Sequence, residues 1–432
     1  MNSNITQFLF QITTCFFMAQ ALFVSPMAMS ATLSSSEPMP TQYYTASQLT
    51  TQATASAGTV KYVSLTGNDK NAGTSASPWR NFDYAVSKLK AGDTLYIKAG
   101  TYKVTKGASF LASGTATKYI TIEGVGGQVI FDCGGVYEYT PLFDTKGYDY
   151  IRFKNFKAIN SRAAVQVSAG SHHVNIDGLN TDKCQFAVLM KSASYVTIKN
   201  SRATNSRNSF RAEGTTHDVV FDGIVTYGSK DIYKGYDKNY TNGDGFIFEN
   251  ETYNIQLLNI LTYNHWDAGI DIKADNVLVR NLVSYGNKNG VKAWGKNIRL
   301  ENVLIYDNLK QRKPDGTYVD GMGINARPGT SVTITRATFV DNQAEDVKVA
   351  GGATLKLSDS IVARKISGGI LLGKYGSFTQ SNVVWYSPLG ASGFSLSTNS
   401  LWSNPLFANW NANDFHLNTA SPARARHAGY TY

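Results

Sequence analysis

The 432-residue chain contains little proline, glutamate or cysteine, with ten prolines and three cysteines in all. Glycine, asparagine, threonine, tyrosine and valine are common instead. This balance disfavours a helical protein and favours many short strands joined by turns. The length suits one large domain or two ordinary ones. We expect one, because the repeat described below is that of a solenoid.

The first 30 residues contain no lysine, arginine, aspartate or glutamate. They carry the apolar stretch FLFQITTCFFMAQALFV and end in small residues between Ala28 and Ala31, which is typical of a secretory signal peptide. A membrane anchor is the alternative, but this run is short and interrupted by glutamine. No other segment is apolar enough to span a bilayer. We therefore expect residues 1–31 to be a signal peptide and the protein to be secreted, without membrane attachment after cleavage.

Residues 32–57 are rich in serine, threonine and alanine and nearly uncharged, which predicts a flexible linker before a domain at 58–432. Cleavage of the signal would remove Cys15 and leave Cys133 and Cys184. Export permits a disulfide between them. They lie about two repeats apart, near the limit of reach for such a bond. Two buried thiols are the alternative.

Positive charge exceeds negative charge by ten at pH 7. Such an excess indicates an anionic partner, which could be nucleic acid, anionic lipid or an acidic polysaccharide. General solubility is the alternative explanation. Nucleic acid is disfavoured because the basic residues are not interleaved with an aromatic stacking motif and the chain is expected to be exported.

Nine short segments repeat one pattern, an alternating apolar run, a small turn and a second apolar pair. Their starting points are Ile151, Val174, Val196, Val219, Ile255, Val277, Ile298, Val332 and Thr354. A strand-like period of about 22 residues is typical of one coil of a parallel β-solenoid. Residues at equal positions in successive coils would then stack about 4.8 Å apart.

Two steps of the repeat are longer than the others. Val219 to Ile255 spans 36 residues and Ile298 to Val332 spans 34, and each step carries an insertion rich in lysine and tyrosine. Insertions in a solenoid emerge as loops on one face, often beside the binding site.

The two ends of the repeat array also carry structural signals. Before the first repeat, PWRNFDYAVSKL places Pro78 at a first helical turn. Its apolar residues follow a helical stripe, so we expect a short helix that caps the open end of the stack. Residues 402–429 are interpreted as irregular closing loops.

Asparagine recurs just after the second strand of many coils. These residues are Asn160, Asn205, Asn264, Asn287, Asn308 and Asn342. A stacked column of asparagines can hydrogen-bond from coil to coil and satisfy buried backbone groups. We therefore predict a structural role for them.

The last strand of each coil carries one outward column with a polar centre. It is predicted to contain Gln166, Leu189, Arg211, Ile247, Asp271, Lys292, Asn325, Lys348 and Leu371. A polar patch midway along a solenoid indicates a binding site in a surface groove. Arg211, Arg327 and Lys348 flank its centre and could hold substrate carboxylates, with arginine as a fork, although surface charge explains them equally well.

Three carboxylates converge on this centre. Asp244 falls in NGDGF, and Asp267 and Asp271 fall in WDAGID one coil later. Unpaired, these groups would repel one another, and a hard cation such as Ca²⁺ would relieve the repulsion. The alternative is that they cap turns and pair with Lys273 or Lys292.

Lys292 follows Asp271 in the same column one coil later. The carboxylates alone would favour its ammonium form, whereas a bound divalent cation would disfavour that form. The neutral amine could then act as a base. The alternative is a salt bridge to Asp271.

The elements DGF (Asp244–Phe246), WDxGxD (Trp266–Asp271) and NGVK (Asn289–Lys292) resemble polysaccharide lyase family 9. The N-terminal run YVSLTGNDKNAGTSASPWRNFDYA is similar to the same family but is less specific. The resemblance covers nearly all of the chain after residue 58. The family's motif usually reads WDDG, and this chain has Ala268 in place of its second aspartate.

The resemblance implies a right-handed parallel β-helix and a Ca²⁺-dependent β-elimination on polygalacturonate. It implies that Asp244, Asp267 and Asp271 are calcium ligands and that Lys292 removes the proton from C5 of the uronate. The substrate implied is an acidic polysaccharide, and we expect a monomer that binds no nucleic acid.

Other functions remain open at this stage. The protein could be a lyase on another polyuronate. A glycoside hydrolase on the same scaffold would need carboxylates at hydrolytic spacing, and a lysine among them favours elimination instead. A β-helix that binds acidic glycan without catalysis is a third possibility.

Overall fold

The computed structural model describes residues 58–135, 140–230, 243–309, 311–312, 318–365, 370–388 and 395–432. The predicted signal peptide and linker lie outside these residues, as does most of the first insertion. Among the described residues, no helix is long and apolar enough to cross a membrane.

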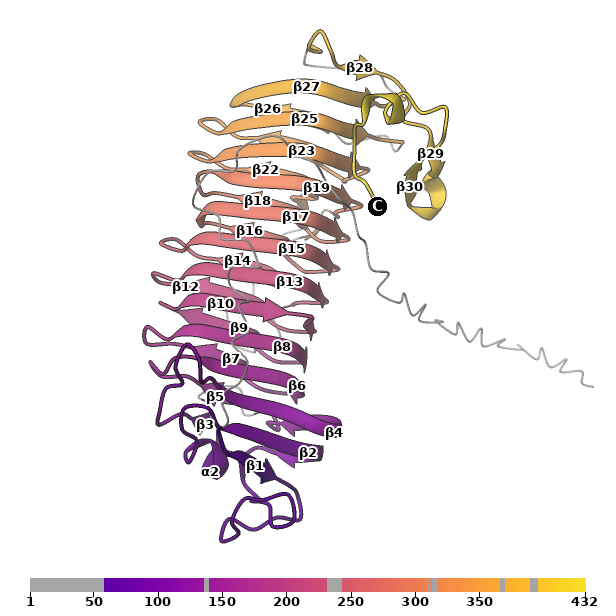
Figure 1. Ribbon diagram of the computed structural model, residues 1–432. Coiled ribbons are helices and arrows are strands. Elements are labelled where there is room, and N and C mark those ends of the chain that lie inside the picture. The colour runs from indigo at the N-terminus through magenta and orange to yellow at the C-terminus, as the bar shows by residue number, and fades with distance from the viewer. Residues whose placement is uncertain are drawn as a thin grey trace, which may run out of the picture. The chain divides into compact units, whose positions relative to one another are not determined.

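Two parallel sheets run along the described chain, and in Figure 1 each coil lies beside its neighbours in sequence. Sheet A, the sheet of longer strands, has 15 described strands. In pairing order they are β1 (Val60–Val63), β2 (Thr94–Lys103), β4 (Ile120–Asp132), β6 (Ile151–Ile159), β8 (His172–Asp182), β10 (Ser194–Lys199), β13 (His217–Tyr227), β15 (Tyr253–Tyr263), β17 (Asp275–Tyr285), β19 (Ile298–Tyr306), β23 (Ser331–Val340), β25 (Thr354–Ala363), β27 (Ser377–Tyr386) and β28 (Leu401–Trp402), with β11 (Arg202–Thr204) between β8 and β13.

Sheet B has 11 described strands and carries the candidate site. They are β3 (Ala108–Ser109), β5 (Phe143–Asp144), β7 (Ala163–Val167), β9 (Phe186–Lys191), β12 (Phe210–Glu213), β14 (Phe246–Phe248), β16 (Ala268–Ile272), β18 (Asn289–Ala293), β22 (Met322–Ala326), β24 (Glu345–Val349) and β26 (Ile370–Lys374). Most coils of the solenoid therefore contribute one strand to each sheet, and the apolar interior lies between the sheets.

The predicted repeat register is confirmed from Ile151 to Val332, since each starting residue pairs with the next across sheet A. The last starting point is wrong by one residue, because Val332 pairs with Leu355 and not with Thr354. Leu355 and Leu357 are buried, whereas Thr354 is exposed. A one-residue slip exchanges the two faces of a strand, so the apolar interior fixes the observed register.

A left-handed residue bends most of the long strands of sheet A and accounts for the small turn in the repeat. At this position Asn259, Asn281 and Asn302 have φ near +56°, a region that asparagine enters more readily than most residues. The Asn281 amide donates to Asn259 Oδ1 at 2.9 Å, and the Asn302 amide donates to Asn281 Oδ1 at 3.0 Å. The left-handed backbone conformation and the hydrogen bonds between stacked amides therefore both favour asparagine at this position.

The predicted asparagine column is two adjacent columns. Asn160, Asn205 and Asn264 have positive φ and form a second bend. Asn287, Asn308 and Asn342 come one residue later in their coils and are fully buried.

The three buried asparagines form a hydrogen-bonded ladder. The backbone N–H of Asn287 donates to Asn308 Oδ1, and the amide of Asn308 donates to Asn342 Oδ1 at 2.6 Å. Their predicted structural role is confirmed.

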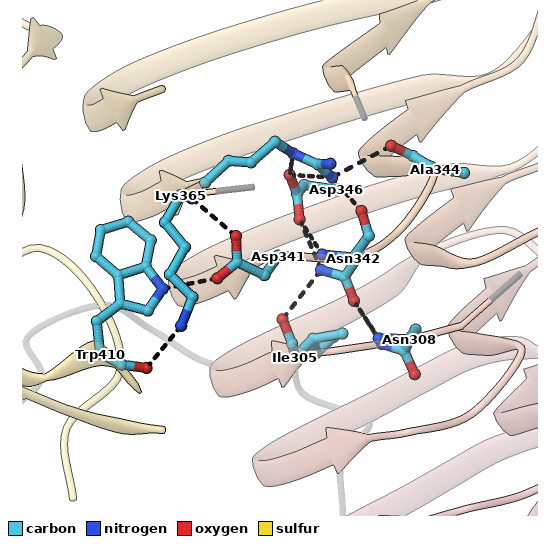
Figure 2. Close-up of polar contacts among 9 residues, drawn as sticks. Ile305, Asn308, Asp341, Asn342, Ala344, Asp346, Lys365 and Trp410 are labelled. Atoms are coloured by element: carbon cyan, nitrogen blue, oxygen red, sulfur yellow. Dashed lines mark hydrogen bonds and ion pairs between the residues drawn. The ribbon is translucent and has the colours of Figure 1, made fainter. Parts of the chain in front are cut away.

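A buried ion pair closes the C-terminal end of this ladder, as Figure 2 shows. Asp346 Oδ1 accepts from the Asn342 amide at 2.7 Å, and Asp346 Oδ2 accepts from Arg364 Nε at 3.0 Å. Asp341, in the neighbouring column, accepts from the Trp410 indole at 2.7 Å. The network thus ties the last coils to the C-terminal segment.

The C-terminal segment was expected to be irregular, and it is more ordered than that. It contains an antiparallel pair, β29 (Phe407–Asn409) and β30 (Asp414–Leu417), and two short 3-10 helices, η1 (Trp410–Ala412) and η2 (Arg424–Arg426). Phe407 and Phe415 pack with apolar residues of β19 to β27, beside which β29 and β30 lie in Figure 1. A second antiparallel pair is β20 (Gln311–Arg312) with β21 (Tyr318–Val319).

The N-terminal helix is shorter than predicted. It is α2 (Phe82–Val86), and Trp79 instead forms a strand-like bridge with Val63. The backbone of Trp79 bonds to Tyr62 and Ser64 on both sides, which excludes it from a helix. Phe82 packs against the interior rings of Phe131 and Phe143, with centroids at 4.9 and 5.7 Å. That α2 acts as an end cap stays a prediction.

Both described cysteines, Cys133 and Cys184, are free and buried. Burial raises the pKa of Cys133 to about 11 and that of Cys184 to about 12. The alternative of two buried thiols is therefore the one observed.

Candidate active site

Sheet B places the predicted polar column in register. Asp271 pairs with Lys292, Lys292 with Asn325 and Asn325 with Lys348. The last member of the column was predicted wrongly, because Lys348 pairs with Gly373 and not with Leu371. A shift of two residues leaves every side chain on the same face, so apolar alternation alone could not exclude it.

Lys292 and Asp267 are in direct contact at the centre of the column. The Lys292 ammonium group donates to Asp267 Oδ1. Lys288 Nζ lies 3.6 Å from the same oxygen and 3.1 Å from Asp320 Oδ2. Asp320 belongs to the second insertion, so that insertion reaches the site, whereas residues 310 and 313–317 lie outside the described part.

The other two carboxylates approach the same place from β16 and the segment before β14. Asp244 Oδ1 accepts from the backbone N–H of Ala268 at 2.9 Å. Asp271 Oδ2 lies 3.4 Å from Lys273 Nζ. Asp271 Oδ1 is buried and has no hydrogen-bond partner among the described residues. The alternative that the aspartates cap a turn and pair with Lys273 or Lys292 is thus present in the structure.

Burial and mutual repulsion set the protonation of this cluster. Burial raises the pKa of Asp244 well above its ordinary value, and the charge of Asp267 raises it further. Burial likewise raises the pKa of Asp271, against the opposing charge of Lys292. Burial alone would lower the pKa of Lys292, but the three aspartates outweigh it and raise that pKa. The carboxylates therefore favour the charged lysine, as the sequence argument expects when no cation is present.

Within the described ranges, no group of three His, Cys, Asp or Glu side chains is arranged to hold a metal ion. The donor set is nevertheless suitable for a hard cation. Among the described residues, the carboxylates of Asp244 and Asp267 make their contacts through Oδ1 only. Asp271 Oδ1 accepts no hydrogen bond there. Three carboxylates with such oxygens fit Ca²⁺, which prefers oxygen ligands.

Asparagines extend the list of unsatisfied groups around the site. Asn289, which pairs with Ala268 at the start of β18, has both amide atoms buried without a partner in the described structure. Asn325, which pairs with Lys292, has a buried Oδ1 that also lacks a hydrogen-bond partner in the described structure. Buried polar atoms without a partner are uncommon in folded proteins.

The three predicted substrate-binding residues are not equivalent. Arg211 pairs with Glu213 and Glu249 at 2.8 and 2.9 Å. Lys348 lies 3.4 Å from Glu345 Oε1. The Arg327 guanidinium lies over the ring of Trp294, 4.2 Å from its centroid. None of the three contacts the aspartate cluster directly, so their role in binding stays a prediction.

Lys288 and Trp294 were not identified from the sequence, and Asn289 was named there only as the first residue of the NGVK element. Lys288 directly precedes β18, and no lysine occupies the equivalent position of the neighbouring coils. A pattern based on columns of equivalent residues could therefore not identify it. Trp294 follows β18 by one residue and is 39% exposed. Large exposed aromatic residues near a polar column are the signal that could have identified it.

A run of glycines holds the site strands close to the buried asparagines. A Cβ on Gly269 would lie 2.6 Å from Ser284 Oγ, and one on Gly290 would lie 2.4 Å from Ile305 Cγ2. Each of these glycines directly precedes an interior residue of β16 or β18. The Asn287 and Asn308 amide nitrogens lie 3.0 Å from the positions of the same two Cβ atoms, so the site strands pack closely against both these side chains and the asparagine ladder.

Residues 61–246 match a family model described as the Pel9A-like right-handed β-helix region. The pectate lyase PEL9 of Emericella nidulans is 23% identical over an alignment of 357 residues, and the match covers 70% of this chain and 78% of that protein. The described chain has the right-handed parallel β-helix fold, and its residues 61–246 are similar to the Pel9A-like family. The matched range includes Arg211 and Asp244 and ends before Asp267, Asp271 and Lys292.

Solved structures share this fold. A rhamnogalacturonan lyase superposes with a TM-score of 0.58 at 17% identity, over 86% of this chain and 99% of its own. The pectate lyase Pel9A gives a TM-score of 0.54 at 17% identity, over 86% and 92%. A complex of XylC with xylose gives 0.54 at 10% identity, over 81% and 87%. The predicted fold class is confirmed.

Proposed function

We propose that this protein is a secreted polysaccharide lyase that cleaves an acidic polyuronate, with pectate as the first candidate, by β-elimination. The observation that carries the proposal is the contact of Lys292 with Asp267 in a cluster of three aspartates on sheet B. A positioned amine beside carboxylates that can hold a cation suits the removal of a proton next to a uronate carboxyl group. The similarity to a pectate lyase over most of the chain supports it.

Lys292 is assigned the role of base. It would take the proton from C5 of the uronate, and the electron pair would form the C4–C5 double bond. The C4–O4 bond would break, and the leaving sugar would depart with O4, which takes up a proton from water. A positioned base of this kind contributes about 10² to 10⁴ in rate. Asp267 would hold the amine in place by accepting its hydrogen bond.

Asp244, Asp267 and Asp271 are assigned as ligands of a Ca²⁺ ion. When bound, the cation would offset the negative charge around Lys292 and stabilise the charge that develops on the substrate carboxylate. The unpartnered Oδ1 of Asp271 is the observation in favour of this assignment.

An absorbance assay on a panel of polyuronates, with and without a chelator, tests the proposal. We expect an unsaturated product from at least one polyuronate, lost on chelation and in Lys292→Ala. Lys103, an exposed lysine paired with Asp132 at 2.5 Å, provides the matched control. Lys103→Ala should retain full activity. Hydrolysis without an unsaturated product would instead indicate a glycoside hydrolase, and turnover unaffected by Lys292→Ala would refute the assigned base.

A further inference from the structure

Two lysines lie against one carboxylate oxygen in the aspartate cluster. The Lys292 ammonium group donates to Asp267 Oδ1, and Lys288 Nζ lies 3.6 Å from the same oxygen. The proposed reaction gives Lys292 the role of base and gives Lys288 none. A second ammonium group at this carboxylate therefore needs its own explanation.

Backbone hydrogen bonds hold Lys288 between two acidic residues. Its N–H donates to the carbonyl oxygen of Asp267 at 3.0 Å, and its carbonyl oxygen accepts from the N–H of Gly321 at 2.8 Å. Lys288 thus lies one coil after Asp267 and one coil before Asp320, and its Nζ lies 3.1 Å from Asp320 Oδ2. Only 13% of the Lys288 side chain is exposed. The fold therefore places a largely buried lysine within reach of both carboxylates.

Lysines of the chain already balance the charge of the aspartate cluster. Lys288 and Lys292 lie against Asp267, and Lys273 Nζ lies 3.4 Å from Asp271 Oδ2. Three ammonium groups thus match the three carboxylates that are assigned to Ca²⁺. A divalent cation that binds here would meet like charges at short range, where solvent and salt screen little. The cation and these lysines therefore compete for the same carboxylates.

Lys288 is the lysine that can leave Asp267 at little cost. Its Nζ is nearer to Asp320, at 3.1 Å, than to Asp267, at 3.6 Å, so it keeps an ion pair after it moves. Lys292 has no carboxylate other than Asp267 within ion-pair distance in the described part of the chain. A buried ammonium group that loses its only partner is strongly destabilising. Asp320, which directly follows β21 in the second insertion, therefore provides the alternative partner that Lys292 lacks.

We infer that Lys288 competes with Ca²⁺ for Asp267 and that Asp320 retains this lysine when the cation is bound. Lys288 is thus a residue that sets the affinity for Ca²⁺, and the second insertion contributes to that affinity through Asp320. The inference rests on the proposed function, because that proposal assigns Asp267 as a Ca²⁺ ligand.

Calorimetric titration of Ca²⁺ into Lys288→Met tests the inference without substrate. Loss of the competing charge should lower the Kd for Ca²⁺ about tenfold, a coupling typical of groups in one ion-pair network. Lys288→Arg keeps the charge and should leave the Kd within about threefold of the wild-type value. A lysine that only supported Asp267 would give the opposite sign, because its removal would loosen a ligand and weaken Ca²⁺ binding.

Asp320→Asn shifts the same competition in the other direction. It removes the alternative partner, so Lys288 should stay at Asp267 and the Kd for Ca²⁺ should rise about threefold. In the Lys288→Met background the same substitution should change the Kd by less than about twofold, because no lysine is left to redirect.

Lys191→Met is the matched control. Lys191 lies on sheet B and pairs with Glu213 Oε1 at 3.0 Å, outside the aspartate cluster. Its removal should leave the Kd for Ca²⁺ within about twofold of the wild-type value, as expected for an independent site. Thermal unfolding in the presence of a chelator shows whether each variant folds, and Lys288→Gln replaces Lys288→Met if the latter does not.

The outcomes separate this inference from the proposed function. Unchanged or weaker Ca²⁺ binding in Lys288→Met would overturn the competition even if the wild-type protein forms unsaturated product that is lost on chelation. Tighter Ca²⁺ binding in Lys288→Met, in a protein that forms no unsaturated product from any polyuronate, would support the competition and overturn the lyase function. Absence of Ca²⁺ binding in both the wild-type protein and Lys288→Met would overturn the competition together with the assigned ligands.

Discussion

Lys292 donates a hydrogen bond to Oδ1 of Asp267, the residue 25 positions earlier in the chain. Parallel pairing of β16 with β18 brings these two segments together. The same oxygen has Lys288 within 3.6 Å. A single carboxylate oxygen therefore orients the assigned base. Asp267 is thus not equivalent to the other two aspartates of the cluster.

Asp267→Asn should lower kcat/KM by about 10²-fold, because a misplaced base loses its orientation toward the reacting proton. Asp320→Asn is the matched control, since Asp320 contacts Lys288 and is not a partner of Lys292. It should lower kcat/KM by less than about fivefold. Similar losses in the two variants would contradict the assignment of Asp267 as the residue that positions Lys292.

Calcium should stabilise the folded protein independently of any activity. A ligand present at about 100 times its Kd adds about 2.7 kcal/mol to folding, so millimolar Ca²⁺ should raise Tm by a few degrees. Asp271→Asn should reduce the rise, because it removes a carboxylate whose Oδ1 has no other partner in the described residues.

Asp359→Asn is the control for the calcium experiment. Asp359 accepts from the Asn382 amide at 2.7 Å in sheet A, outside the aspartate cluster. The shift in Tm caused by Ca²⁺ should persist in this variant. An unchanged Tm of the wild-type protein in millimolar Ca²⁺ would remove the metal assignment.

The repeat made the fold predictable, because alternation with a fixed period determines which side chains share a column. It placed Asp271 beside Lys292 correctly. It failed at Thr354, where a threonine was aligned in place of Leu355, and at Leu371, where a two-residue shift keeps the face unchanged. Periodicity therefore predicts well which face of a strand a side chain occupies. It predicts poorly which residues pair between strands near the ends of the repeat.

The side-chain partners at the site could not be predicted in the same way. Lys288 reaches Asp267 from the residue before β18, and Asp320 reaches Lys288 from an insertion. Neither residue belongs to a repeating column. The pairing of Arg327 with Trp294 depends on rotamers at adjacent strand ends, which a sequence pattern does not specify.

Gly290→Ala should destabilise the protein and reduce activity together. The added Cβ would lie 2.4 Å from Ile305 Cγ2 and 2.5 Å from the carbonyl oxygen of Gly323. Overpacking of this kind costs about 1–3 kcal/mol. Relief would move β18, which carries Lys292. Thermal unfolding and the lyase assay measure the two effects.

Gly351→Ala is the control for Gly290→Ala. A Cβ at Gly351 would meet only the carbonyl oxygen of Tyr375, at 3.8 Å, which is ordinary contact. Tm should change by less than about 2 °C. A wild-type Tm in Gly290→Ala would show that the site strands do not rest tightly on the asparagine ladder.

Asp346 should make stability depend on pH in the opposite sense to most carboxylates. Burial raises its pKa to about 6 despite the charge of Arg364, whereas the unfolded chain has a pKa near 3.8. Between these values the folded protein binds the proton more tightly. The contribution of Asp346 to stability is therefore fully present below pH 3.8 and is lost as the pH rises to about 6.

Comparison of the wild-type protein with Asp346→Asn isolates this group, since the amide does not titrate. The wild-type advantage in the free energy of unfolding should be larger at pH 4 than at pH 7, by up to about 3 kcal/mol. Asp414→Asn is the control of opposite sign, because a hydrogen bond from His416 lowers the pKa of Asp414. Its contribution should be present near pH 7 and fall as the pH drops. An advantage of Asp346 that grows from pH 4 to pH 7 would show that its ion pair with Arg364 outweighs burial.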